Sequence, residues 1–296
     1  MKSPLPMRDG VSPSQQYLPV GLWCSMLAFL QQFYPEVDAA TWVARMHKGE
    51  VVDEEGLCLM PDHAYRAGAR IYYYRELEGE TPIPFEETIL FQDEHLLVVD
   101  KPHFLPVVPS GRYLHETLLV RLKRKFHLEH LTPIHRLDRE TAGVILFSSN
   151  LASRGDYQSL FHQREISKVY EALAATLPGR PFPFTYRSRL VAGEPFFRMQ
   201  EVCGESNAET HIEVLKHRGD AVLYQLRPVT GKKHQLRVHL AALGIPIVND
   251  RFYPELLPEK IDDFLQPLQL LARSICFKDP YTGQRRYFAS RRVLEF

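Results

Sequence analysis

The sequence lacks several features that would place it in a particular class of protein. No run of about 18 apolar residues occurs among its 296 residues, so we expect no membrane span. Residues 1–6 contain no apolar segment followed by a small-residue cleavage site, so we expect no secretion signal and a cytoplasmic protein. The four cysteines are far apart and form no Cys-x-x-Cys pair, which disfavours a zinc cage or a disulfide scaffold.

Signatures of other catalytic classes are also missing. There is no GxxxxGK[ST] phosphate loop and no GxSxG nucleophile elbow. His234 and His239 are five residues apart and do not share a helix face, whereas His127 and His130 could share one but have no paired acid or cysteine. We therefore predict no metal site.

The net charge is zero, which argues against a protein that holds nucleic acid by bulk charge alone. The charges are nevertheless segregated along the chain. Residues 76–94 carry seven acids and no Lys or Arg, residues 112–142 carry seven Lys or Arg against four acids, and residues 231–239 carry three Lys or Arg and no acid. A solvated face is the usual interpretation of one such run, but two basic runs beside polar motifs favour a surface that faces phosphates.

Composition and hydrophobic spacing divide the chain into four parts. Residues 1–16, rich in Pro, Ser and Gln, are predicted to be a disordered leader. Residues 17–75 are expected to form a small α/β unit with two helices, the second capped by Asp38, and two short strands. Residues 76–87 are acidic, contain proline and are predicted to be a linker.

The remaining segment, 88–296, is expected to be one larger α+β domain. Hairpin-like pairs of strands outnumber strand–helix–strand units, which predicts a mixed, mainly antiparallel sheet with flanking helices. Helices are expected at 114–126, 150–162 and 232–243. Strands are expected at 88–91, 96–100, 143–147, 167–175, 184–191, 209–215, 221–227 and 268–277.

Asp138 lies in a turn crowded with charges. The turn follows His135 and Arg136 and leads directly into the apolar run 143–147, which is short enough to be a buried strand. Charges held in this way keep fixed positions. For an isolated aspartate, a turn cap or a pairing with Arg136 or Arg139 is the ordinary interpretation.

The helix expected at 232–243 carries a second polar group. Arg237 falls beside its leucine face, so we expect it to be half buried and to need a carboxylate partner. Thr230 and Gly231 precede the helix, and its first turn, with its unpaired N–H groups, is suited to phosphate or carboxylate. A helix with a solvated basic edge is the alternative.

Tyr170 lies in the strand expected at 167–175. Strand alternation places it on the same face as Lys168. By default it is a core aromatic, but a tyrosine that faces a cleft could stack on an extruded base at about 1–3 kcal/mol.

Together these segments resemble the RluA-type pseudouridine synthase family over about residues 85–296, with six motifs in the right order. The central three are HRLDRETAG at 135–143, KVYEA at 168–172 and TGKKHQLRVHL at 230–240. The others lie at 100–102, 246–250 and 268–270. Six ordered motifs are far more specific than any one of them.

This resemblance implies a fold with a central cleft and an RNA pseudouridine synthase acting on ribosomal or transfer RNA. It implies cleavage of a glycosidic bond, rotation of the base and rejoining through carbon 5, with no cofactor. Asp138 would act as nucleophile or base, paired with Arg237, while Tyr170 would stack on the uracil and assist proton removal. Side chains expected to bind the RNA are Arg136, His135, Arg139, Leu236, Lys232, Lys233, His234 and Gln235.

Residues 17–75 weakly resemble the small alpha-L RNA-binding domain, although the acidic turn 53–56 replaces a polar or basic one. We expect a monomer with RNA as its partner. Two rival functions stay open: a catalytically silent RNA-binding or ribosome-assembly protein on the same fold, and a hydrolytic nucleoside glycosidase. An assay of conversion separates them.

Overall fold

The computed structural model describes residues 3–77, 79–258 and 262–295, and the chain divides into two compact units. The first comprises residues 1–81, 109–115 and 120–129, and the second comprises the rest. Met1 and Lys2 of the predicted leader, Glu78 of the predicted linker, and residues 259–261 and 296 lie outside the described residues. No helix of the described chain is long and apolar enough to span a membrane.

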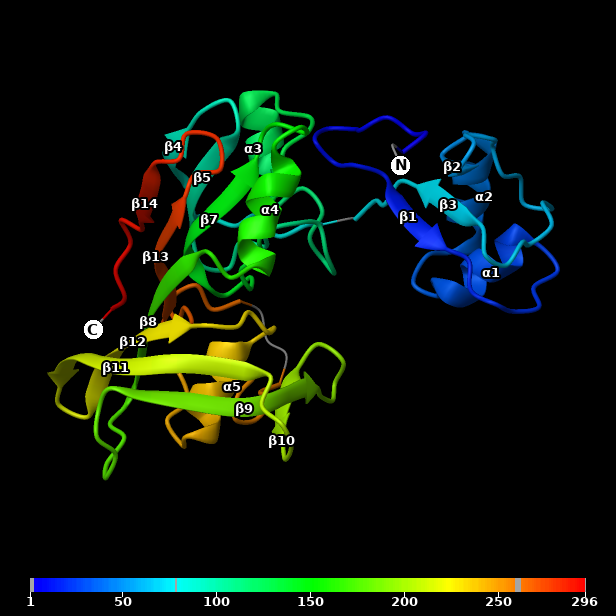
Figure 1. Cartoon of the computed structure of the whole chain (residues 1–296). Helices are drawn as coiled ribbons and strands as arrows, with labels where there is room; N and C mark the ends of the chain where they lie inside the picture. The colour runs from blue at the N-terminus through cyan, green and yellow to red at the C-terminus, as the bar shows by residue number, and fades with distance from the viewer. Residues whose placement is uncertain (1–2, 78, 259–261, 296) are drawn as a thin grey trace. The chain divides into compact units, whose positions relative to one another are not determined.

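The first unit is a three-stranded antiparallel sheet with two helices (Figure 1). Ser25 and Asp38 cap the helices by accepting hydrogen bonds from the backbone N–H groups of Ala28 and Ala40. Trp42 and Phe29 lie in its core. The elements are β1 (Ser14–Tyr17), α1 (Met26–Phe33), α2 (Ala39–His47), β2 (Val51–Asp53) and β3 (Arg70–Tyr73).

The predicted disordered leader is wrong for its described part. β1 begins at Ser14 and pairs with β3, and Arg8 Nη1 donates to Glu50 Oε1 at 2.6 Å. A polar strand of this kind is stabilised by pairing with a distant segment, which local composition does not reveal.

The predicted boundaries need a second correction. The division at 81/82 falls inside the segment 76–87, but residues 109–115 and 120–129, assigned from the sequence to the larger domain, belong to the first unit. Their backbone is held there by hydrogen bonds: Leu114 N–H donates to Glu80, and Arg124 Nε donates to the carbonyl of Asp9.

The second unit is built on one eleven-stranded sheet in the described residues, ordered β10-β9-β11-β12-β8-β13-β7-β5-β4, with β14 on β13 and β6 on β7. All its strand pairs are antiparallel except β7 with β13, which confirms the predicted mixed, mainly antiparallel sheet. The strands are β4 (Thr88–Gln92), β5 (Leu96–Lys101), β6 (Thr132–Pro133), β7 (Ala142–Ser148), β8 (Ser167–Ala175), β9 (Phe184–Ala192), β10 (Met199–Val202), β11 (Ala208–Arg218), β12 (Ala221–Pro228), β13 (Leu270–Lys278) and β14 (Arg285–Ala289).

Two helices cover different halves of this sheet (Figure 1). Tyr157 of α4 (Arg154–His162) packs in a cluster with β5, β7 and β13, and Leu240 of α5 (Gln235–Ala242) packs in another with β8, β11 and β12. A further helix, α3 (Leu118–Phe126), belongs to the first unit from residue 120 onward and begins four residues later than predicted. The boundary between the two apolar clusters, and so between the halves of the sheet, lies along β8, β13 and β7.

A glycine allows β7 and β13 to approach each other closely at this boundary. Gly143 has φ +114°, and a Cβ added to it would lie 2.2 Å from the carbonyl oxygen of Ala272. The parallel pair of β7 with β13 is made at this position, with Ala272 opposite Gly143. The close approach fixes the start of β7 and therefore the turn that contains Asp138.

Candidate active site

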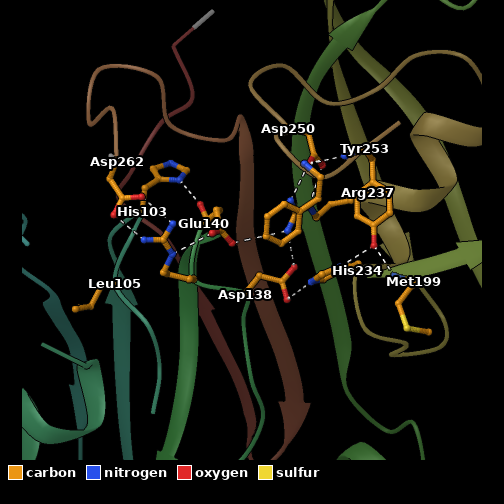
Figure 2. Close-up of polar contacts among 12 residues, drawn as sticks. His103, Leu105, Asp138, Glu140, Met199, His234, Arg237, Asp250, Tyr253 and Asp262 are labelled. Atoms are coloured by element: carbon orange, nitrogen blue, oxygen red, sulfur yellow. Dashed lines mark hydrogen bonds and ion pairs between the residues drawn. The ribbon is translucent and has the colours of Figure 1, made fainter. Parts of the chain in front are cut away.

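Asp138 lies in the turn between β6 and β7 and faces the start of α5 (Figure 2). Its Oδ2 is 3.4 Å from Arg237 Nη1, and its Oδ1 is 3.7 Å from His234 Nε2. The side chain is 27% exposed, whereas those of Arg237 and His234 are 1% and 6% exposed. Because this carboxylate is partly exposed while the cationic Arg237 beside it is buried, a substrate can reach the carboxylate.

Arg237 is held mainly by Asp250. Nε and Nη2 of Arg237 donate to the two oxygens of Asp250 at 2.8 and 2.7 Å, while the contact with Asp138 is longer. Burial alone would lower the pKa of Arg237, but the hydrogen bonds and charge of Asp250 raise it overall. The predicted half-burial is wrong because α5 is buried from Gln235 to Leu240, and the predicted pairing with Asp138 is the weaker of two contacts.

His234 immediately precedes α5 and has the left-handed conformation, φ +54°. A residue with this backbone does not continue a helix, which explains why α5 begins at Gln235 and not at Lys232 as predicted. Its Nδ1 lies 2.8 Å from the hydroxyl of Tyr253, and burial lowers its pKa. The ring therefore connects Tyr253 to Asp138.

Tyr170 lies on β8 and packs, together with Leu236, in the cluster beneath α5. Burial first, and then the charge of Asp138, raise the pKa of its phenol. The hydroxyl consequently keeps its proton at neutral pH. Tyr170 and Leu236 therefore share one apolar cluster, and Tyr170 lies near enough to Asp138 to feel its charge.

Arg139 does not fit the predicted role in RNA binding. Nη1 and Nη2 donate to the carboxylate of Asp262 at 2.8 and 2.9 Å, and Nε donates to Glu140 at 3.0 Å (Figure 2). Glu140 also lies 3.8 Å from Arg237, and although burial works in the opposite direction, the two guanidinium groups lower its pKa overall. Arg139 therefore ties the Asp138 turn to the chain around Asp262.

Two further residues that were predicted to bind RNA make their hydrogen bonds inside the protein. His135 Nε2 accepts a hydrogen bond from the N–H of Leu146, and burial lowers the pKa of His135 to about 3. Gln235 accepts from Thr230 and from the N–H of Lys232, and donates to the carbonyl of Glu209 and to the hydroxyl of Thr210. These side chains stabilise the β7 turn and the start of α5, a correction to their predicted role.

The remaining predicted ligands point to solvent. Arg136, Lys232 and Lys233 are exposed, so their charges are accessible to phosphates. Among the described residues, no group of three or more His, Cys, Asp or Glu side chains is placed to hold a metal ion.

Lys101, Asp250 and Tyr253 received no role from the sequence, although 101 and 250 lie in recognised motifs. The ammonium of Lys101 is fully buried and donates to the carbonyls of Pro102, Leu105 and Arg139. Burial lowers the pKa of Lys101 to about 7. A lysine that ends an apolar strand was a usable signal for such a buried amine with a structural role.

The chain resembles known proteins in both sequence and fold. A family described as RNA pseudouridylate synthase matches residues 95–242. The chain is similar to the "Dual-specificity RNA pseudouridine synthase RluA" of Salmonella typhimurium, with 36% identity over 68% of this chain and 90% of that protein. An uncharacterized RNA pseudouridine synthase of Synechocystis sp. is 28% identical over 77% of this chain and 79% of its own length. The solved structure of "Human RNA Pseudouridylate Synthase Domain Containing 1" is 25% identical, with a TM-score of 0.58 over 70% of this chain and 84% of that one.

Proposed function

The chain belongs to the RluA-type family of RNA pseudouridine synthases, and from this premise we propose that Asp138 performs the isomerisation of uridine in ribosomal or transfer RNA. The observation that carries the proposal is the position of the carboxylate. It is 27% exposed and is backed by Arg237, which is buried and held by Asp250. Glu140, the other carboxylate near Arg237, is paired with Arg139 at 3.0 Å and lies farther from Arg237, at 3.8 Å.

Arg237 supports the carboxylate by geometry as much as by charge. The bidentate pair with Asp250 fixes the guanidinium plane, so Nη1 is presented to Asp138 without reorganisation during the reaction. Asp138 then either attacks carbon 1′ of the ribose as a nucleophile, which displaces uracil, or removes a proton from the ribose, so that uracil leaves and a glycal intermediate remains. Both routes require a carboxylate in contact with an ordered cation.

Tyr170 and Leu236 would receive the uracil once it has left the helical stack, at a cost of a few kcal/mol. The raised pKa of Tyr170 favours a neutral phenol that stacks on the base over a phenolate that removes its proton. Arg136, which is exposed beside the turn, would fill the vacated space or hold adjacent phosphates. Lys232 and Lys233 would bind the RNA backbone.

The substrate and the setting are part of the same proposal. One relative is named a dual-specificity RNA pseudouridine synthase, which supports RNA as the substrate and more than one site or RNA as the target. We further propose that the protein works as a monomer in the cytoplasm.

The test is conversion of cellular RNA by purified protein. RNA from cells without this gene is incubated with wild type, with Asp138→Asn and with the control Asp220→Asn, an exposed residue, and pseudouridine is mapped by mass spectrometry. Wild type and Asp220→Asn should convert the same uridine, while Asp138→Asn should bind the RNA and convert none. Full conversion by Asp138→Asn would overturn the role of Asp138. Free uracil would indicate a glycosidase, and binding without conversion by wild type would indicate the silent RNA-binding protein.

A further inference from the structure

A cavity of about 490 Å³ lies outside the group of side chains around Asp138. One wall comes from the end of α4 and the start of β8, and the other from the chain that precedes α5. Its charged lining residues are all basic: Arg164, Lys168 and Lys232, with His162 beside them and no Asp or Glu. A concave surface lined by one sign of charge concentrates ions of the other sign.

The charges of this basic cavity, defined by Arg164, Lys168 and Lys232, are not neutralised within the protein. Over the described ranges, none of these side chains forms an ion pair with a carboxylate. Glu209, whose pKa is lowered in part by Arg164, is already paired with Arg187 at 2.9 Å. Lys168 is half buried, and burial and the like charge of Arg164 lower its pKa. An anion in the cavity would relieve this repulsion.

The basic cavity adjoins the candidate active site. Lys168 and Tyr170 are two residues apart on one face of β8, which separates their Cα atoms by about 7 Å. Phe161 lines the cavity and stacks on His135, three residues before Asp138, with ring centroids 4.7 Å apart. An RNA strand whose base lies on Tyr170 therefore has its backbone within reach of Lys168.

Gly231 keeps the cavity open at the side of α5. A Cβ added to Gly231 would lie 3.8 Å from Lys168 Nζ, so a larger side chain would occupy the space in front of the ammonium. The absence of a side chain at this position leaves room for a tetrahedral anion to contact Lys168 and Lys232 together.

We propose that the basic cavity is a phosphate subsite, which takes one backbone phosphate of the nucleotide next to the target uridine. This rests on the proposed function, because it assumes that the uridine lies on Tyr170. Lys168 and Arg164 would bind the phosphate, and Lys232 would close the subsite. The subsite would fix where the strand bends as the uridine leaves its stack.

A salt titration tests the subsite without requiring a known substrate. The double variant Arg164→Gln with Lys168→Met is compared with Lys216→Met with Arg218→Gln, an equal loss of charge at the exposed far end of β11. Affinity for a fluorescent oligouridylate is measured against salt concentration. The slope of log K against log salt should fall by about 0.7–0.9 in the first variant, the amount for one lost phosphate. It should stay at the wild-type value in the control, and equal slopes in the two variants would overturn the proposal.

Single methylphosphonates, which remove the charge of one phosphate, then locate the contact. They are placed in turn on both sides of the uridine that wild type converts. A methylphosphonate at one position should weaken binding to wild type but not to the Arg164→Gln, Lys168→Met variant. The single variant Lys168→Arg, which keeps the charge, should respond as wild type does. If every position weakens both proteins equally, the subsite is refuted. If wild type converts no RNA, the proposed function fails, but the salt titration still decides whether the cavity binds phosphate.

Discussion

The hydroxyl of Tyr253 determines which ring nitrogen of His234 carries the proton, and this is the nitrogen that faces Asp138. The N–H of Met199 donates to this hydroxyl at 2.8 Å, so the hydroxyl is left to donate its own proton to His234 Nδ1, also at 2.8 Å. Burial lowers the pKa of His234, which leaves the ring neutral with its single proton on Nε2. That nitrogen lies 3.7 Å from Asp138 Oδ1, close enough for a hydrogen bond to form when substrate closes the site.

Tyr253→Phe should lower the rate of conversion by about tenfold without changing RNA affinity. The substitution removes two hydrogen bonds, one to His234 and one from the N–H of Met199, each worth about 0.5–1.5 kcal/mol, and frees the ring to present either nitrogen to Asp138. Single-turnover formation of pseudouridine measures the effect. Tyr186→Phe, whose hydroxyl binds Glu201 away from this site, is the control. Equal rates for the two variants would exclude the role of Tyr253.

Arg237→Lys should lower both stability and activity although it keeps the charge. Lysine cannot reproduce the forked contact with Asp250, so we expect a loss of about 2–4 kcal/mol in the free energy of unfolding and a rate about 100-fold lower. Denaturant titration and pseudouridine formation measure the two effects. Arg187→Lys, at an exposed ion pair with Glu209, should change neither. A stable, fully active Arg237→Lys protein would contradict the bidentate role.

Gly143→Ala should destabilise the fold by about 2–5 kcal/mol. The added Cβ would meet the carbonyl of Ala272 at 2.2 Å, and φ +114° is unfavourable for alanine. Gly155→Ala, in the first turn of α4 where an added Cβ would meet no atom within 4 Å, should instead raise stability by about 0.4–1 kcal/mol. Opposite signs in denaturant titration are expected, and a neutral Gly143→Ala would mean that β7 and β13 separate easily.

Stability should fall as the pH falls below about 6.5, partly because of His239. Burial lowers its pKa to about 4, so between pH 6.5 and 4 the unfolded chain binds a proton that the folded protein does not. His239→Gln should remove about one proton from this dependence, or about 1.4 kcal/mol per pH unit. The control is His217→Gln, at the exposed end of β11, which should keep the wild-type slope. Denaturant titrations at several pH values compare the slopes, and unchanged slopes in both variants would contradict the burial of neutral His239.

Much of the fold was predictable because it follows from local periodicity. Alternation placed β8 at the bounds that the structure has, Ser167–Ala175, and the cap at Asp38 was correct. Local signals were insufficient where two distant segments stabilise each other. β1 is polar and is held by pairing with β3, which lies more than fifty residues later in the sequence.

The candidate site shows the same division. Spacing and motif order identified Asp138, Tyr170 and Arg237, and the structure brings them together. The sequence could not decide which polar and charged side chains make their contacts within the protein and which remain available to RNA. Arg139 is occupied by Asp262, 123 residues away, and Gln235 by hydroxyl and backbone groups of β11 and the adjoining chain.

The sequence by itself determined the family, the order of the elements and the position of the candidate carboxylate, Asp138, because these depend on residue type and short-range spacing. Only the tertiary structure decided that Arg237 is shared between Asp250 and Asp138, and that Tyr253 orients His234. The physical reason is that ion pairs and hydrogen bonds depend on distances of a few ångströms between side chains. Those distances are set by how β7, β8 and α5 pack, and no residue carries them alone.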